Sequence, residues 1–130
     1  MDSPSLPSRM RWLIGLSGLA LVGLLSWEAC AKQEGAVPAE FQKGEATFKA
    51  NCARCHGERG VGTAQGPPLV HKIYEPNHHG DAAFQRAAAN GVRAHHWQFG
   101  DMPKIEGVSL DDVEQIVAYV RWLQRQAGIM

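Results

Sequence analysis

The side chains best suited to chemistry in this sequence lie in the pentapeptide "CARCH", which runs from Cys52 to His56. Cys52 and Cys55 are three positions apart, so on a helical turn both sulfurs face the same side. Such a pair alone could serve thiol exchange or form half of a zinc site. The histidine that follows makes the pattern C-x-x-C-H, the signature of covalent haem attachment. The sequence therefore predicts one haem c, with thioether bonds from both cysteines and with His56 bound to the iron.

The alternative interpretations of "CARCH" each lack a feature that they require. A zinc site needs a second pair of ligands at finger spacing, and the sequence has no second cysteine pair. A thioredoxin-like site needs a βαβ pattern around it, which we do not find. A disulfide is the usual state of two cysteines in an exported protein, but it leaves the adjoining histidine unexplained.

The stretch "AHHWQFGDMP", residues 94–103, offers three candidates for the second axial ligand: His95, His96 and Met102. Pro103 favours an extended conformation at Met102. The methionine also lies in a turn-rich loop, whereas a core methionine usually lies on a helical or strand face. Its soft thioether suits low-spin haem iron. We therefore predict Met102 as the second ligand, with His95 or His96 as the next candidates.

Five histidines remain beside His56, and the sequence leaves their purpose open. One interpretation places them in surface loops. In a second, one or two of them join Trp97 in donating hydrogen bonds to a haem propionate. A third is a separate copper or zinc site, although adjacent histidines rarely both face one metal within a strand or helix. The five are His71, His78, His79, His95 and His96.

The elements that must position these groups are helices. Residues 39–51 are predicted to be helical, with Gly44 in the interior, where a glycine costs about 1 kcal/mol and therefore needs a reason. A short helix is predicted over about residues 81–90, closed by Gly91. Between the two, "GERGVGTAQGPPL" is predicted to be loop from its glycine and proline content.

The last helix is predicted to begin after Ser109, an N-cap candidate that forms a near capping box with Asp112. Gly128 offers a stop. Its apolar residues follow the i, i+3, i+4, i+7 pattern, so we expect them to be core. They are Leu110, Val113, Ile116, Val117, Val120 and Leu123.

At this point the chain resembles the class I cytochromes c, over most of residues 39–125. Four stretches carry the resemblance: "GEATFKANCARCH", "GPPL", "GDMP" and "LDDVEQIVAYVRWL". The resemblance implies an all-α, small cytochrome c fold of three to five helices around one covalently bound haem. It also implies that the N- and C-terminal helices cross closely, with Gly44, Phe48 and Tyr119 at the crossing.

The same resemblance implies roles for "GPPL", residues 66–69. A haem-bound histidine needs an acceptor for its free ring N–H, which fixes the ring and raises its basicity. In class I cytochromes c a proline carbonyl in this stretch is the acceptor, and Pro67 matches it here. Leu69 would pack on the face of the haem ring.

Length and charge indicate one domain without a strong electrostatic preference, because 130 residues carry 13 basic and 13 acidic side chains. We expect residues 1–31 to be a signal peptide or an N-terminal membrane anchor. Their uncharged stretch 12–27 is shorter than the roughly 20 residues of a spanning helix, and Ala29-Cys30-Ala31 matches a cleavage pattern. Lipidation of Cys30 is a third possibility. Residues 32–38 would be a linker and 39–130 the cytochrome c domain, in the periplasm or on the outer face of the cytoplasmic membrane.

Two axial ligands leave no open position for a substrate, so we expect a single-electron carrier and not an enzyme. Its partners would be redox proteins that dock transiently; we expect no nucleic acid, a monomer, and membrane attachment, if any, through the N-terminal segment. Two other functions remain open. One is a haem subunit of a larger dehydrogenase or oxidase, and the other is a haem-based sensor with a labile sixth ligand.

Overall fold

The structure is a computed structural model, and it describes residues 35–129. Over that range it is helical, with no strand, and it confirms the predicted all-α fold. No helix in the described range is both long and apolar enough to cross a membrane. The expected signal peptide or anchor over residues 1–31, with Cys30, lies outside the described residues, as do residues 32–34 of the expected linker 32–38. The α-helices are α1 (Ala39–Asn51), α2 (Ala53–His56), α3 (Asp81–Asn90) and α4 (Leu110–Gln126), with 3-10 turns η2 (Glu58–Gly60) and η3 (Lys72–Tyr74).

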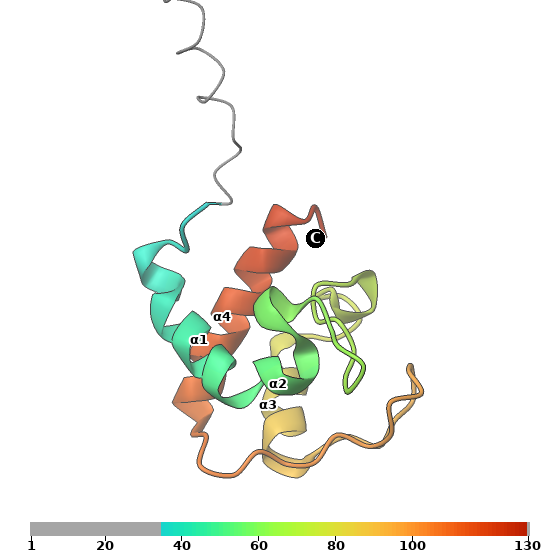
Figure 1. Ribbon diagram of the computed structural model, residues 1–130. Coiled ribbons are helices and arrows are strands. Elements are labelled where there is room, and N and C mark those ends of the chain that lie inside the picture. Colours follow the sequence, from blue (N-terminus) through green and yellow to red (C-terminus); the bar gives the residue numbers. More distant parts are fainter. Residues whose placement is uncertain (1–34, 130) are drawn as a thin grey trace, which may run out of the picture. The chain divides into compact units, whose positions relative to one another are not determined.

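Helices α1 and α4 cross, as Figure 1 shows, and their contact forms the centre of the core. At the crossing, a Cβ atom on Gly44 would overlap the carbonyl oxygen of Gln115 and lie 2.9 Å from the Tyr119 Cβ. Beside it the rings of Phe48 and Tyr119 pack with centroids 5.7 Å apart, and both side chains are fully buried. The expected crossing at these residues is confirmed.

That close approach predicts the effect of Gly44→Ala. Alanine is the better helix former by about 1 kcal/mol, so a merely tolerated glycine would yield a more stable protein. Here the added methyl group would push the two helices apart, and we expect a net loss of about 2 kcal/mol. Urea unfolding of the haem-loaded protein measures it. Ala46→Gly, on an exposed position of the same helix, is the control and should lose only about 1 kcal/mol. A stabilised Gly44→Ala protein would contradict the packing argument.

Helix α4 begins with the predicted cap and buries most of the predicted stripe. The Ser109 hydroxyl accepts from the Asp112 N–H (3.1 Å), and the Asp112 carboxylate accepts from the Ser109 N–H (3.2 Å), which completes a capping box. The expectation that Leu110 is core is wrong, since it is 65% exposed. Leu110 is the first residue of the helix, in the turn before the buried face begins at Val113.

Two polar side chains in the same helix are buried, which the sequence pattern did not predict. Arg121 is 5% exposed and Gln124 is fully buried. The Arg121 guanidinium donates to the carbonyls of Tyr74 and His79, both at 2.6 Å, and pairs with Asp81 at 2.8 Å. Gln124 donates to the Leu69 carbonyl (2.8 Å). Buried polar groups are costly unless paired, and these are paired with the backbone of the loop between α2 and α3.

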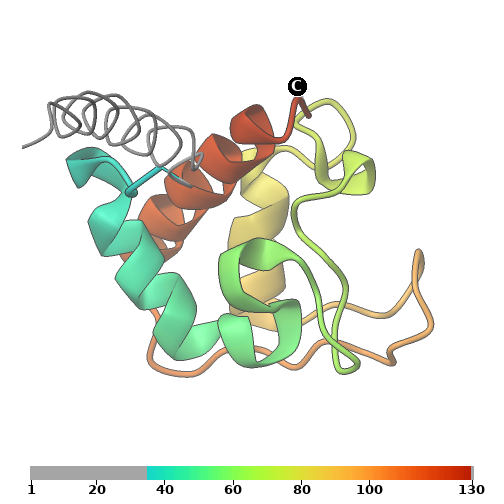
Figure 2. The same ribbon diagram turned by 45° about the horizontal axis from the view of Figure 1, so that its top comes forward.

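The two connections complete the fold (Figure 2). The first runs from α2 to α3, and the stretch predicted to be all loop contains the short turn η2. The second, residues 91–109, is irregular except for an isolated antiparallel bridge between Val92 and Met102. Helix α3 has the predicted bounds, packs on α4 and ends at Gly91, whose φ is +74°. These connections carry most of the expected site residues.

Candidate functional site

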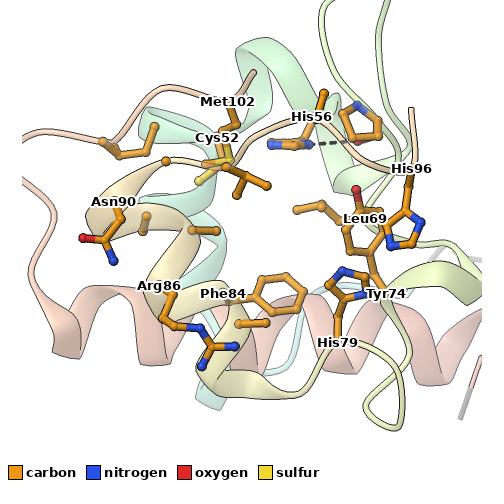
Figure 3. Close-up of a pocket in the computed structure, with 18 of the residues that line it drawn as sticks. Cys52, His56, Leu69, Tyr74, His79, Phe84, Arg86, Asn90, His96 and Met102 are labelled. Carbon is orange, nitrogen blue, oxygen red and sulfur yellow. Dashed lines mark hydrogen bonds between the residues drawn. The ribbon is translucent and has the colours of Figure 1, made fainter. Parts of the chain in front are cut away.

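A half-open cavity of about 560 Å³ lies between the helices and the two connections. Figure 3 shows Cys52, His56, Leu69 and Met102 at its wall. The volume lies within the range of cofactor sites, and the lining is mostly apolar, as such sites require. Six of the seven expected site residues line it: Cys52, His56, Pro67, Leu69, Trp97 and Met102. Cys55 is the exception; it is half-buried next to the cavity but is not part of its wall.

His56 is fixed in the orientation that an iron ligand needs. Its Nδ1 lies 2.8 Å from the carbonyl oxygen of Pro67, the contact that the sequence resemblance implies. A carbonyl can only accept, so Nδ1 carries the proton and Nε2 keeps its lone pair. Burial lowers the pKa of His56, against a smaller opposing effect of the Pro67 hydrogen bond. The side chain is therefore a neutral imidazole at neutral pH, which is the form that binds metal.

The environment of Cys52 is poorly suited to thiol exchange. Burial, and secondarily the neighbouring Cys55, raise the pKa of the Cys52 thiol to about 11. Exchange catalysts instead hold a thiolate by lowering the thiol pKa. Cys52 and Cys55 form no disulfide with each other. Because Cys52 precedes α2 and Cys55 lies within it, one helical turn carries both sulfurs and His56.

Met102 does not lie in a helix; a pair of backbone hydrogen bonds holds it in position. Its N–H donates to the Val92 carbonyl and its carbonyl accepts from the Val92 N–H, both at 2.9 Å. Gly91 precedes Val92 and has a φ of +74°. A Cβ atom on Gly91 would lie 2.5 Å from the Met102 carbonyl oxygen and 3.0 Å from the Lys104 nitrogen, so this close approach leaves no room for a side chain. The extended conformation predicted from Pro103 fits this bridge. The bridge itself was not predicted, because one pair of residues leaves no repeating pattern in the sequence.

The indole of Trp97 lines the cavity. Its indole Nε1 is buried and has no hydrogen-bond partner. Burial raises the pKa of the neighbouring Tyr74 phenol, and the Trp97 side chain beside it partly offsets this. A buried donor without a partner is costly. Because Nε1 is not exposed to the cavity, a haem propionate there would reach it only if the Trp97 side chain turned, so the expected propionate contact stays a prediction.

Four of the remaining histidines gather in one cluster, and three of them, His79, His95 and His96, line the cavity. The fifth, His71, makes contacts elsewhere. The Nδ1 of His71 accepts from the Ile73 N–H at 3.2 Å, and its ring packs edge-on against Trp97 with centroids 5.1 Å apart. The pKa of His96 is lowered, first by local desolvation and then by repulsion from the neighbouring histidines. The gathered residues are His78, His79, His95 and His96.

These observations define a small helical haem protein with a C-x-x-C-H attachment turn. The chain belongs to the cytochrome c family, whose model matches residues 41–124. No solved structure is significantly similar to it. Members of the family bind covalent haem c with its iron and transfer electrons, so this chain is a haem-based electron-transfer protein. The cavity and the neutral His56, which the Pro67 carbonyl orients, fit that cofactor.

Proposed function

We propose that the chain is a single-electron carrier whose one haem c is bound by His56 and Met102 as axial ligands. It would act in the periplasm or on the outer face of a bacterial-type cytoplasmic membrane and dock transiently with redox proteins. The carrying observation is that one cavity contains both a lone-pair imidazole, oriented by Pro67, and a thioether held by the Val92 bridge. Cys52 and Cys55 would form the thioether bonds.

The chain's own residues would perform three tasks. His56 would offer Nε2 because Pro67 holds the proton at Nδ1. Met102 would offer its sulfur from a backbone that two hydrogen bonds keep in place. Buried apolar side chains, among them Leu69 and Ile116, would exclude water, which limits reorganisation and tunes the potential. When bound, the haem iron supplies reversible one-electron oxidation and reduction.

Resistance of the reduced protein to carbon monoxide tests the carrier function. Because the Val92 bridge restrains Met102, we expect no change in the reduced optical spectrum under carbon monoxide at neutral pH. The control is the same protein with Met102→Ala, in which the gas should bind and shift the spectrum. Ready binding to the unmodified protein would instead favour a ligand sensor, or a haem subunit of a larger enzyme.

A further inference from the structure

We propose that His78, His79 and His96 form a binding site for one divalent transition-metal ion that prefers imidazole, such as Zn²⁺ or Cu²⁺. One ring nitrogen from each residue lies within 4.8 Å of the others. The Nε2 atoms of His78 and His96 are only 3.3 Å apart, and the ring of His79 lies 4.7 Å and 5.1 Å, centroid to centroid, from those of His78 and His96. Figure 3 shows the rings of His79 and His96 at the same rim of the cavity.

The protonation of His79 prepares it as a ligand. Its Nδ1 lies 2.7 Å from the carbonyl oxygen of Ile73, so this nitrogen carries the proton and Nε2 keeps its lone pair. A backbone carbonyl that accepts the second ring N–H is the usual support of a metal-bound histidine. His95 has the same arrangement, with Nδ1 2.8 Å from the Arg93 carbonyl and its ring 4.4 Å from that of His96. It is therefore the nearest candidate for a fourth ligand.

The backbone around this histidine cluster is anchored to the core. The buried Arg121 donates to the His79 carbonyl at 2.6 Å. Its positive charge is paired with Asp81 at 2.8 Å, which reduces its repulsion of a bound cation. Arg121 therefore holds the turn that carries His78 and His79 against the core. Because the two residues lie in a turn, both rings can face one ion, which adjacent histidines in a helix or strand rarely do.

The ligand set determines the class of metal. Three imidazoles suit Zn²⁺, Cu²⁺ and Ni²⁺, whereas Mg²⁺ and Ca²⁺ prefer oxygen ligands. Cu²⁺ should bind more tightly than Zn²⁺ at the same nitrogens. His78 and His79 lie in the turn after η3, and His96 lies in the segment that leads to Trp97 and Met102. A bound ion would therefore join these two parts of the chain. Metal binding should therefore stabilise the folded protein.

Titration calorimetry of the haem-loaded protein, made without a polyhistidine tag, tests the proposal. We expect Zn²⁺ to bind with a stoichiometry of one, and Mg²⁺ not to bind. His78→Gln and His96→Gln should each weaken Zn²⁺ binding by about 100-fold or more, beyond the ~10–100-fold typical of losing an outer-shell partner. His71→Gln is the matched control, because its Nδ1 is engaged by the Ile73 N–H, and it should bind as the unmodified protein does.

Two further readouts separate this site from other histidine chemistry. Bound Cu²⁺ should show hyperfine coupling to at least three nitrogens in its EPR spectrum, while the haem absorption stays unchanged. Zn²⁺ should raise the melting temperature of the unmodified protein but not that of His96→Gln. Unaltered affinity in both His78→Gln and His96→Gln, or weak binding of several ions, would overturn the proposal. The proposal requires that His96 does not bind the haem iron, and the spectrum of His96→Gln separates the two cases: lost Zn²⁺ binding with unchanged haem absorption assigns His96 to the metal site, whereas altered haem absorption assigns it to the haem.

Discussion

The double variant Cys52→Ser, Cys55→Ser will leave a chain that does not fold cooperatively. Without thioether bonds the haem is lost, and the cavity of about 560 Å³ must collapse or fill with water. At about 24 cal/mol per Å³, an unfilled cavity of that volume costs up to about 13 kcal/mol. A small domain has a total stability of about 5–15 kcal/mol. The buried side chains that face the cavity, such as Val113 and Ile116, would lose their contacts.

Far-ultraviolet circular dichroism and urea unfolding measure this outcome. We expect weak helical signal and no cooperative transition. Cys30→Ser is the matched control, because it removes a cysteine outside "CARCH", and the haem-loaded domain should unfold as the unmodified one does. A helical apo-protein with a sharp urea transition would show that the protein core alone is sufficient, against the cavity argument.

The second large effect is expected from Met102→Ala. A thioether favours the reduced state of haem iron relative to a nitrogen ligand or water. Its loss should lower the midpoint potential by on the order of 0.1 V or more, within the roughly 0.8 V range that axial ligands span. The Val92 bridge uses backbone atoms only, so alanine keeps both of its hydrogen bonds. The loss should therefore be confined to the ligand.

Redox titration followed by absorbance measures the potential. His95→Ala and His96→Ala are the controls, since these residues are the rival ligands in the same segment. In a buffer with chelator, both should keep the potential of the unmodified protein within experimental error. A large drop in either of them, with Met102→Ala unchanged, would assign the sixth position to histidine.

Local signals in the sequence predicted the fold well. Helices α1 and α3 have the predicted bounds, and α4 begins after the predicted Ser109 cap. Caps, Gly91 and apolar periodicity act over a few residues, so the sequence contains them directly. Periodicity fails at a helix end, where Leu110 continues the pattern but lies outside the buried face. The attachment turn was also predictable, because its three functional residues are adjacent.

Features that depend on distant residues could not be predicted from the sequence. Arg121 and Gln124 look like surface residues, and their burial depends on carbonyls roughly 40 to 55 positions away. The Val92–Met102 bridge is a single pair. The histidine cluster joins residues 78 and 96, which lie 18 positions apart. Each of these contacts forms only when the loops have folded. The course of the loops depends on both the haem site and the α1–α4 core.

The near-infrared absorption of the oxidised protein tests the central claim most directly. Ligation of the iron by the Met102 sulfur predicts a weak sulfur-to-iron charge-transfer band at the far-red edge of the spectrum, absent from Met102→Ala. The same band should survive in His96→Ala. An unmodified oxidised protein without this band would contradict His56/Met102 ligation, and a histidine would then be the leading candidate for the sixth ligand.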